Sequence, residues 1–287
     1  MEFYLSRTGE YLINVAISTF NQLIFIFGIL LILITLLSLS ANLVARLSVR
    51  FWGRNLFLYG FSWLGTSVHE LSHAFFALVF GHKITEIVLF EPNKDGASLG
   101  HVNHSYNKNS IYQKTGNFFI GIGPVLASGI ALFFATWFIF HYDMTQNAPF
   151  RMTTEIFSNF PVLKQDAVAL KNSLFVFYNL VFSPNSTVWW KVILYIYILY
   201  SIGSSMTLSS SDIRSSLSGF LWVIVFFLLF NLFTFWIGNF MSVFLLKIAK
   251  YIAGFLFLLL LALLTNLVFI VGLFILNLIK GLFVSRK

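Results

Sequence analysis

Long apolar runs separated by short polar stretches make up most of the chain. The runs are Leu23–Val44, Leu56–Phe80, Phe118–Phe140, Val188–Met206, Leu217–Phe240 and Ile252–Ile279. Each has about the 20 residues that an α-helix needs to cross the hydrocarbon core of a bilayer. The pattern therefore predicts an all-α polytopic membrane protein with about six transmembrane helices.

The polar stretches predict how these spans are connected. After the second span, Lys83–Phe90 and Ala97–His104 flank the turn-prone segment Glu91–Gly96, which predicts a small membrane-associated β-hairpin. In the connection between the third and fourth spans, Val168–Phe182 is partly apolar and is interpreted as a re-entrant or interfacial helix. Residues 1–20 are mixed in polarity and are expected to form a short interfacial helix.

Composition narrows the class of protein further. With 58% hydrophobic and 10% charged residues, the chain does not read as a soluble domain. The net charge of +8 is spread along the loops, which indicates contact with lipid headgroups and no binding of nucleic acid. No linker or repeat divides residues 1–287, so we expect a single domain in the lipid bilayer.

The second span contains the pattern H-E-x-x-H, formed by His69, Glu70 and His73. Residues four apart lie on one face of a helix, so the two imidazoles can bind the same ion. Glu70 lies about 100° round the helix, where it can take a proton from a water that the ion activates. Ionisable groups at bilayer depth cost roughly 2.5–3.5 kcal/mol each, which favours a function for them. The alternative is that the two imidazoles only form hydrogen bonds between helices.

A hydrolytic zinc site needs a third protein ligand and one open position. The chain has no cysteine, so the ligand must be a histidine or a carboxylate. Asp212 follows the fourth span and returns to the side of the membrane on which the motif lies, which makes it the best candidate. Asp212 also suits the N-cap of the fifth helix, and both roles are compatible. The other acidic residues near these spans are poorer candidates for the third ligand. Asp143, Glu155 and Asp166 are expected on the opposite side of the membrane, and Glu86, Glu91 and Asp95 belong to the predicted hairpin.

The chain resembles the site-2 protease family of intramembrane zinc metalloproteases in four features. These are the motif His69–His73 inside a membrane helix, a hairpin after that helix, the pair Gly123-Pro124, and Asp212 two spans after the motif. The resemblance implies one Zn²⁺ held by His69, His73 and Asp212, with Glu70 as the catalytic residue. It also implies that the chain hydrolyses peptide bonds of a membrane protein that has a transmembrane segment.

This chain departs from the pattern of that family at two places. The family's Asn after Gly-Pro is absent, and Asp212 is followed by Ile213 where the family has Gly. Pro124 is expected to free a backbone carbonyl, although a packing kink is the simpler interpretation of the pair. The family implies that the strand Lys83–Phe90 pairs with the unwound substrate.

Two other functions fit the same residues. One is a catalytically inactive scaffold that binds a partner helix, and the other is a metal-binding transporter, for which the remaining spans offer few polar residues. His101 and His104 lie three apart on a strand and point to opposite faces, so they are expected to be surface or interfacial residues.

The sequence also bears on the location of the protein. Lysine and arginine are equally divided between the two predicted sides, so charge does not orient the chain in the membrane. The resemblance implies that the side with the motif faces the cytoplasm. The absence of cysteine favours a bacterial inner membrane. Nothing in the sequence indicates an oligomeric state.

Overall fold

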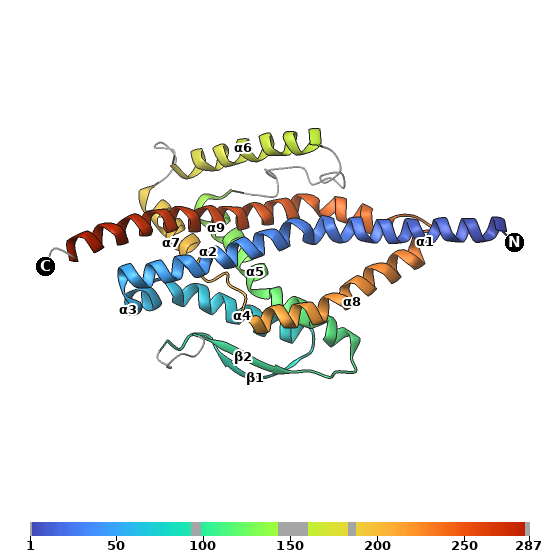
Figure 1. The fold of residues 1–287 in the computed structure, drawn as a ribbon, viewed down its shortest axis with the longest axis horizontal. Helices are drawn as coiled ribbons and strands as arrows, with labels where there is room; N and C mark the ends of the chain where they lie inside the picture. The colour runs from blue at the N-terminus through green and yellow to red at the C-terminus, as the bar shows by residue number, and fades with distance from the viewer. Residues whose placement is uncertain (1, 93–98, 143–159, 183–187, 285–287) are drawn as a thin grey trace.

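The structure, a computed structural model, describes residues 2–92, 99–142, 160–182 and 188–284. Its elements are α1 (Glu2–Leu23), α2 (Ile29–Trp52), α3 (Arg54–Phe57), α4 (Trp63–Val79), β1 (Lys83–Val88), β2 (His101–Ser105), α5 (Ile111–Phe140), α6 (Phe160–Phe182), α7 (Trp189–Gly203), α8 (Ser210–Thr234) and α9 (Phe240–Val284). Short π-helical segments, Ile24–Gly28 and Leu58–Ser62, join α1 to α2 and α3 to α4. In Figure 1, α2 and α9 lie along each other, with α6 on one side of the molecule and the hairpin on the other.

Four helices are long and apolar enough to cross a membrane, which is compatible with a multi-pass integral membrane protein. They are Thr8–Trp52, Ile111–Phe140, Ser210–Thr234 and Phe240–Leu282. The other two expected spans are helical but are not among these four. The 15 residues of α7 extend about 22 Å at about 1.5 Å per residue, less than the ~30 Å hydrocarbon core. The helical segment with α4 carries the polar motif, which lowers its mean hydropathy.

The ends of the helices differ from those of the apolar runs that predicted them, and α7 is shorter than its run Val188–Met206. The expected interfacial helix of residues 1–20 and the span Leu23–Val44 are instead parts of one long helix that ends at Trp52. Likewise, α9 has 45 residues, although its predicted span was Ile252–Ile279. Hydropathy detects only the lipid-compatible part of a helix, whereas backbone hydrogen bonds continue through polar residues. The interrupted run Val168–Phe182 belongs to α6, where Phe177 packs on Phe257 of α9.

Large apolar side chains of α2, α5, α7 and α9 fill the centre of the bundle. Leu37, Leu132, Tyr195 and Phe257 are among the most deeply buried of them. Next to this core, α5 and α8 approach so closely that a Cβ at Gly121 would overlap Ser216 and the carbonyl of Asp212. Such close approach through small residues is typical of helices packed in lipid. It fixes the start of α8 against the middle of α5.

The predicted hairpin is present as a two-stranded antiparallel sheet. Ile84 pairs with His104 and Val88 pairs with His101, with an irregularity between Ile84 and Glu86. The centre of the predicted turn, including Asp95, lies outside the described residues. Just before β2, a Cβ at Gly100 would overlap the Cγ of Glu70 and two backbone carbonyls of the β1 side. The hairpin therefore rests directly on the helix that carries the motif.

Candidate metal centre

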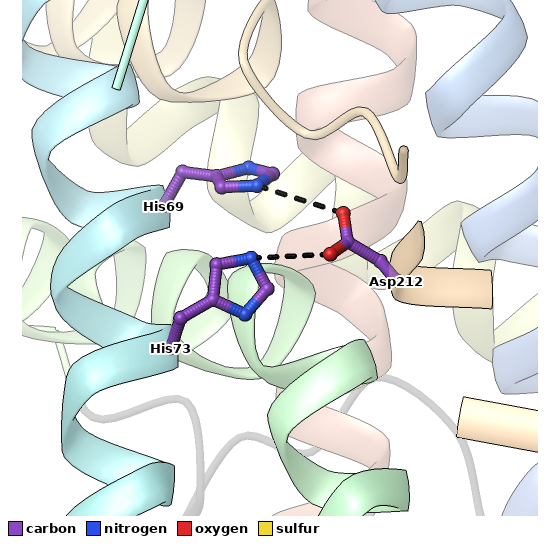
Figure 2. A group of neighbouring side chains, drawn as sticks. All are labelled: His69, His73 and Asp212. Carbon is purple, nitrogen blue, oxygen red and sulfur yellow. Dashed lines mark ion pairs between the residues drawn. The ribbon is translucent and has the colours of Figure 1, made fainter. Parts of the chain in front are cut away.

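His69 and His73 lie one turn apart on α4, and their side chains point the same way (Figure 2). Their ring centroids are 5.0 Å apart. Both side chains are largely withdrawn from solvent, with 14% and 10% of their surfaces exposed. The helical spacing alone produces this arrangement, as the sequence predicted.

Backbone carbonyls hold both imidazole rings from behind. The Nδ1 of His69 lies 3.3 Å from the carbonyl oxygen of Ser205, and the Nδ1 of His73 lies 2.9 Å from that of Ile120. A carbonyl oxygen only accepts, so each Nδ1 carries the proton and donates it. Each Nε2 then carries a lone pair and no proton, and it faces Asp212. This tautomer is typical of histidine ligands in metal sites.

The two carbonyls are available for reasons that the sequence explains. In an α-helix the amide of residue 124 would donate to the carbonyl of Ile120, but Pro124 has no N–H. A packing kink, the simpler interpretation of Gly123-Pro124, is therefore not the whole role of this pair. The carbonyl that Pro124 frees also contacts the Nδ1 of His73. Ser205 lies just beyond the end of α7 at Gly203, where carbonyls have no helical partner.

Asp212 reaches the two imidazoles from the first turn of α8 (Figure 2). Its Oδ1 lies 3.4 Å from the Nε2 of His73, and its Oδ2 lies 3.9 Å from the Nε2 of His69. The expected N-cap role belongs to Ser209, whose hydroxyl accepts from the amide of Asp212. Asp212 closes this capping box, since its Oδ2 accepts from the amide of Ser209 at 2.8 Å. The same carboxylate therefore fixes the helix start and faces the motif.

The Nε2 atoms of His69 and His73 and the carboxylate of Asp212 converge on one another. A neutral imidazole that donates through Nδ1 has only a lone pair at Nε2, and an ionised carboxylate only accepts. A cation among such acceptors would relieve their mutual repulsion. Two ligands of one tetrahedral zinc are about 3.3 Å apart for bonds of about 2.0–2.1 Å. The His73–Asp212 separation of 3.4 Å fits this value, and His69 needs only a small approach.

Glu70 lies beside the cluster and is 8% exposed. It borders a cavity of about 720 Å³ that also contacts His69, His73 and Asp212. Residues of the connection between α7 and α8, such as Ser204 and Ser209, also line this cavity. Glu70 therefore borders the cavity without being one of the three residues that could hold a metal ion.

The two histidines of the hairpin have separate partners, as their spacing predicted. The Nε2 of His101 lies 3.2 Å from the Oε2 of Glu86, and the Nδ1 of His104 lies 3.0 Å from the Nδ1 of His82. His104 is nevertheless not a surface residue, because it is half-buried and borders the cavity. The expectation of a surface role was wrong for His104, since the hairpin folds back onto α4.

Comparisons with known proteins found no family model, curated protein or solved structure that matches this chain. The similarity to the site-2 protease family therefore depends on the quoted motif and the residues around it.

Proposed function

We propose that the protein is an intramembrane zinc metalloprotease that hydrolyses peptide bonds of membrane-embedded substrates. The observation that carries this proposal is the convergence of three acceptors, the Nε2 atoms of His69 and His73 and the carboxylate of Asp212, beside the buried carboxylate of Glu70. The arrangement matches the ligand type of hydrolytic zinc sites, which use histidine and carboxylate and leave one position open.

The proposed roles follow from the chemistry of each group. His69, His73 and Asp212 would hold one Zn²⁺, which supplies Lewis acidity toward a carbonyl and activates water at neutral pH. Glu70 takes a proton from the attacking water and later passes it to the leaving amine. The carbonyls of Ser205 and Ile120 keep both imidazoles in the ligating tautomer.

The cavity is large enough for an unwound peptide segment, because pockets for drug-sized ligands typically have about 300–1,000 Å³. A transmembrane helix hides its own peptide bonds, so the substrate must be locally extended before attack. Among the described residues, β2 borders the cavity and β1 does not. The resemblance implied that the substrate pairs with Lys83–Phe90. A substrate that contacted only this strand would lie outside the cavity. The proposed partner is a membrane protein with a transmembrane segment, and the proposed location is a bacterial inner membrane.

Metal analysis and a cleavage assay test this function together. We expect about one zinc per chain in the wild type and none in His73→Ala or Asp212→Ala, because removing one of three ligands opens the site. Glu70→Gln should retain zinc and lose about 10²–10⁴-fold in rate, the range typical of a general base. The substrate for the assay is a synthetic Leu/Ala-rich peptide of about 20 residues with a central Gly-Asn-Gly-Ser segment, reconstituted in liposomes.

Glu86→Gln is the matched control, since it also neutralises a carboxylate, but on the exposed part of the hairpin. It should leave zinc content and cleavage unchanged. Zinc without cleavage in the wild type would instead favour the inactive scaffold. Zinc transport across the liposomes would favour the transporter, and a wild-type protein without zinc would refute both the protease and the metal-binding transporter.

A further inference from the structure

His82 and His104 form a hydrogen-bonded pair that the proposed mechanism does not use. His82 follows α4 directly, where Gly81 has a φ of 70° and the amide of His82 donates to the carbonyl of Ala77. This is the usual way of ending a helix at glycine, and it turns the ring of His82 back toward the hairpin. His82 is 4% exposed, and its ring stacks on Tyr106 with centroids 4.9 Å apart.

The hydrogen bonds of this pair fix the position of each proton. The Nε2 of His82 lies 2.9 Å from the carbonyl of Gln113, which only accepts, so Nε2 carries the proton. In the neutral ring, Nδ1 of His82 is then an acceptor. The Nδ1 of His104, 3.0 Å away, must donate to it. The Nε2 of His104 is therefore left with a lone pair and no proton.

Gln113 holds the pair from the start of α5. Its Nε2 donates to the carbonyl of Gly81 at 2.7 Å, and its Oε1 accepts from the amide of Asn107 at 2.6 Å. The carbonyl that fixes His82 thus belongs to a residue that is itself held on both sides. The tautomer of the pair is built into the junction of α4, the hairpin and α5.

The cavity determines what the lone pair of His104 can meet. His104 borders the same cavity as Glu70 and the three converging ligands. Burial lowers the pKa of His104, and His82 and His73 lower it further, so the ring stays neutral and keeps its lone pair at neutral pH. A peptide that enters the cavity brings backbone N–H groups, which lose their helical partners when it is unwound and need an acceptor.

We propose that His104 is a substrate-binding residue whose Nε2 accepts a hydrogen bond from one backbone N–H of the unwound peptide, with His82 as the positioning residue. This inference rests on the proposed function and deepens it. It assigns to the hairpin a side-chain contact that selects an extended peptide over an intact helix, in which that N–H is already bonded. His104 would therefore recognise the extended conformation of the substrate backbone rather than a particular substrate side chain.

Single-atom changes in the peptide test the contact. The probe is the synthetic peptide described above, with each central amide replaced in turn by an ester, which removes one N–H donor. Binding is measured to the Glu70→Gln protein, so cleavage is not needed. We expect one ester to weaken binding about five- to tenfold, the value of a typical hydrogen bond. In the double variant with His104→Ala, the same ester should bind as tightly as the all-amide peptide.

His82→Phe keeps the stacking on Tyr106 but removes the Nδ1 acceptor, so it should also abolish the ester effect. His141→Asn, which removes a histidine at the far end of α5, should preserve it. Zinc content should be unchanged in all of these variants. In ¹⁵N spectra of the protein alone at pH 7, the Nε2 of His104 should be unprotonated.

Several outcomes overturn the inference. These are an ester effect of equal size with and without His104, no ester effect at all, a protonated Nε2 in the spectra, or loss of zinc in His104→Ala, which would make it a metal ligand. Peptide binding that depends on His104 without any cleavage refutes only the protease. Cleavage without dependence on His104 refutes only this inference, and a protein that binds no such peptide refutes both.

Discussion

At the scale of single residues, an amide that Pro124 lacks determines where His73 points. The sequence predicted His69, Glu70 and His73 from their spacing, and Asp212 from topology, and the structure brings them together. The sequence could not identify the carbonyls of Ile120 and Ser205 in the same way. Every residue has a carbonyl, and no side chain indicates which carbonyl accepts a hydrogen bond from an imidazole. Pro124 is the one exception, since it frees the carbonyl four residues before it.

Pro124→Ala tests this role. Alanine restores an N–H that can donate to the carbonyl of Ile120 and so competes with the Nδ1 of His73. We expect zinc affinity to fall about 10–100-fold, the usual cost of losing a partner behind a metal-binding histidine, while α5 itself becomes no less stable. Competition with a zinc chelator measures the affinity. Unchanged affinity would mean that packing alone orients His73.

At the scale of elements, the close approach of α5 and α8 sets the distance between Asp212 and the motif. Hydropathy predicted the two helices but not their contact, because the sequence gives no direct measure of which small residues face each other. Hydropathy also missed the helix ends: the apolar run Leu217–Phe240 begins inside α8, which starts at Ser210 with the capping box and ends at Thr234. Asp212, the candidate metal ligand, belongs to this capping box. The start of the helix predicted from hydropathy, Leu217, therefore lies beyond the candidate site.

Gly121→Ala should separate these helices. The added Cβ would overlap backbone atoms of Asp212 and Ser216, which cannot rotate away. We expect a destabilisation of about 1–3 kcal/mol, typical of overpacking, and at least tenfold weaker zinc binding, because Asp212 moves away from His73. Gly272→Ala is the matched control on α9, where nothing lies within 4 Å of the added atom. Thermal unfolding and zinc titration of both variants measure the difference.

At the scale of the whole molecule, the candidate centre joins four segments that are distant in sequence. The candidate ligands come from α4 and α8, and the carbonyls that contact the two imidazoles come from α5 and from the connection after α7. The sequence predicted a helical membrane protein with a hairpin, and the structure has four helices long and apolar enough to cross a membrane and a two-stranded sheet. The number of spans did not follow from the sequence, because a helix with a polar motif and one of 15 residues both carry apolar runs.

Removal of the metal should therefore destabilise the whole bundle. At zinc about 1,000-fold above its Kd, binding contributes about 4 kcal/mol to the free energy of unfolding. A strong chelator should lower the Tm of the wild type but not of Asp212→Asn. The asparagine keeps an oxygen that can accept from the amide of Ser209, so α8 still starts normally. Equal sensitivity of both proteins to the chelator would place the stabilising ion elsewhere.

The double role of the Asp212 carboxylate bears on how long an ion stays in place. Because Oδ2 also closes the capping box, the carboxylate cannot swing out of the site without opening the first turn of α8. Dissociation of an ion bound there would thus be linked to fraying of a helix end that is packed against α5. The residence time of the metal would then be set by a folding event in the protein rather than by ligand exchange alone.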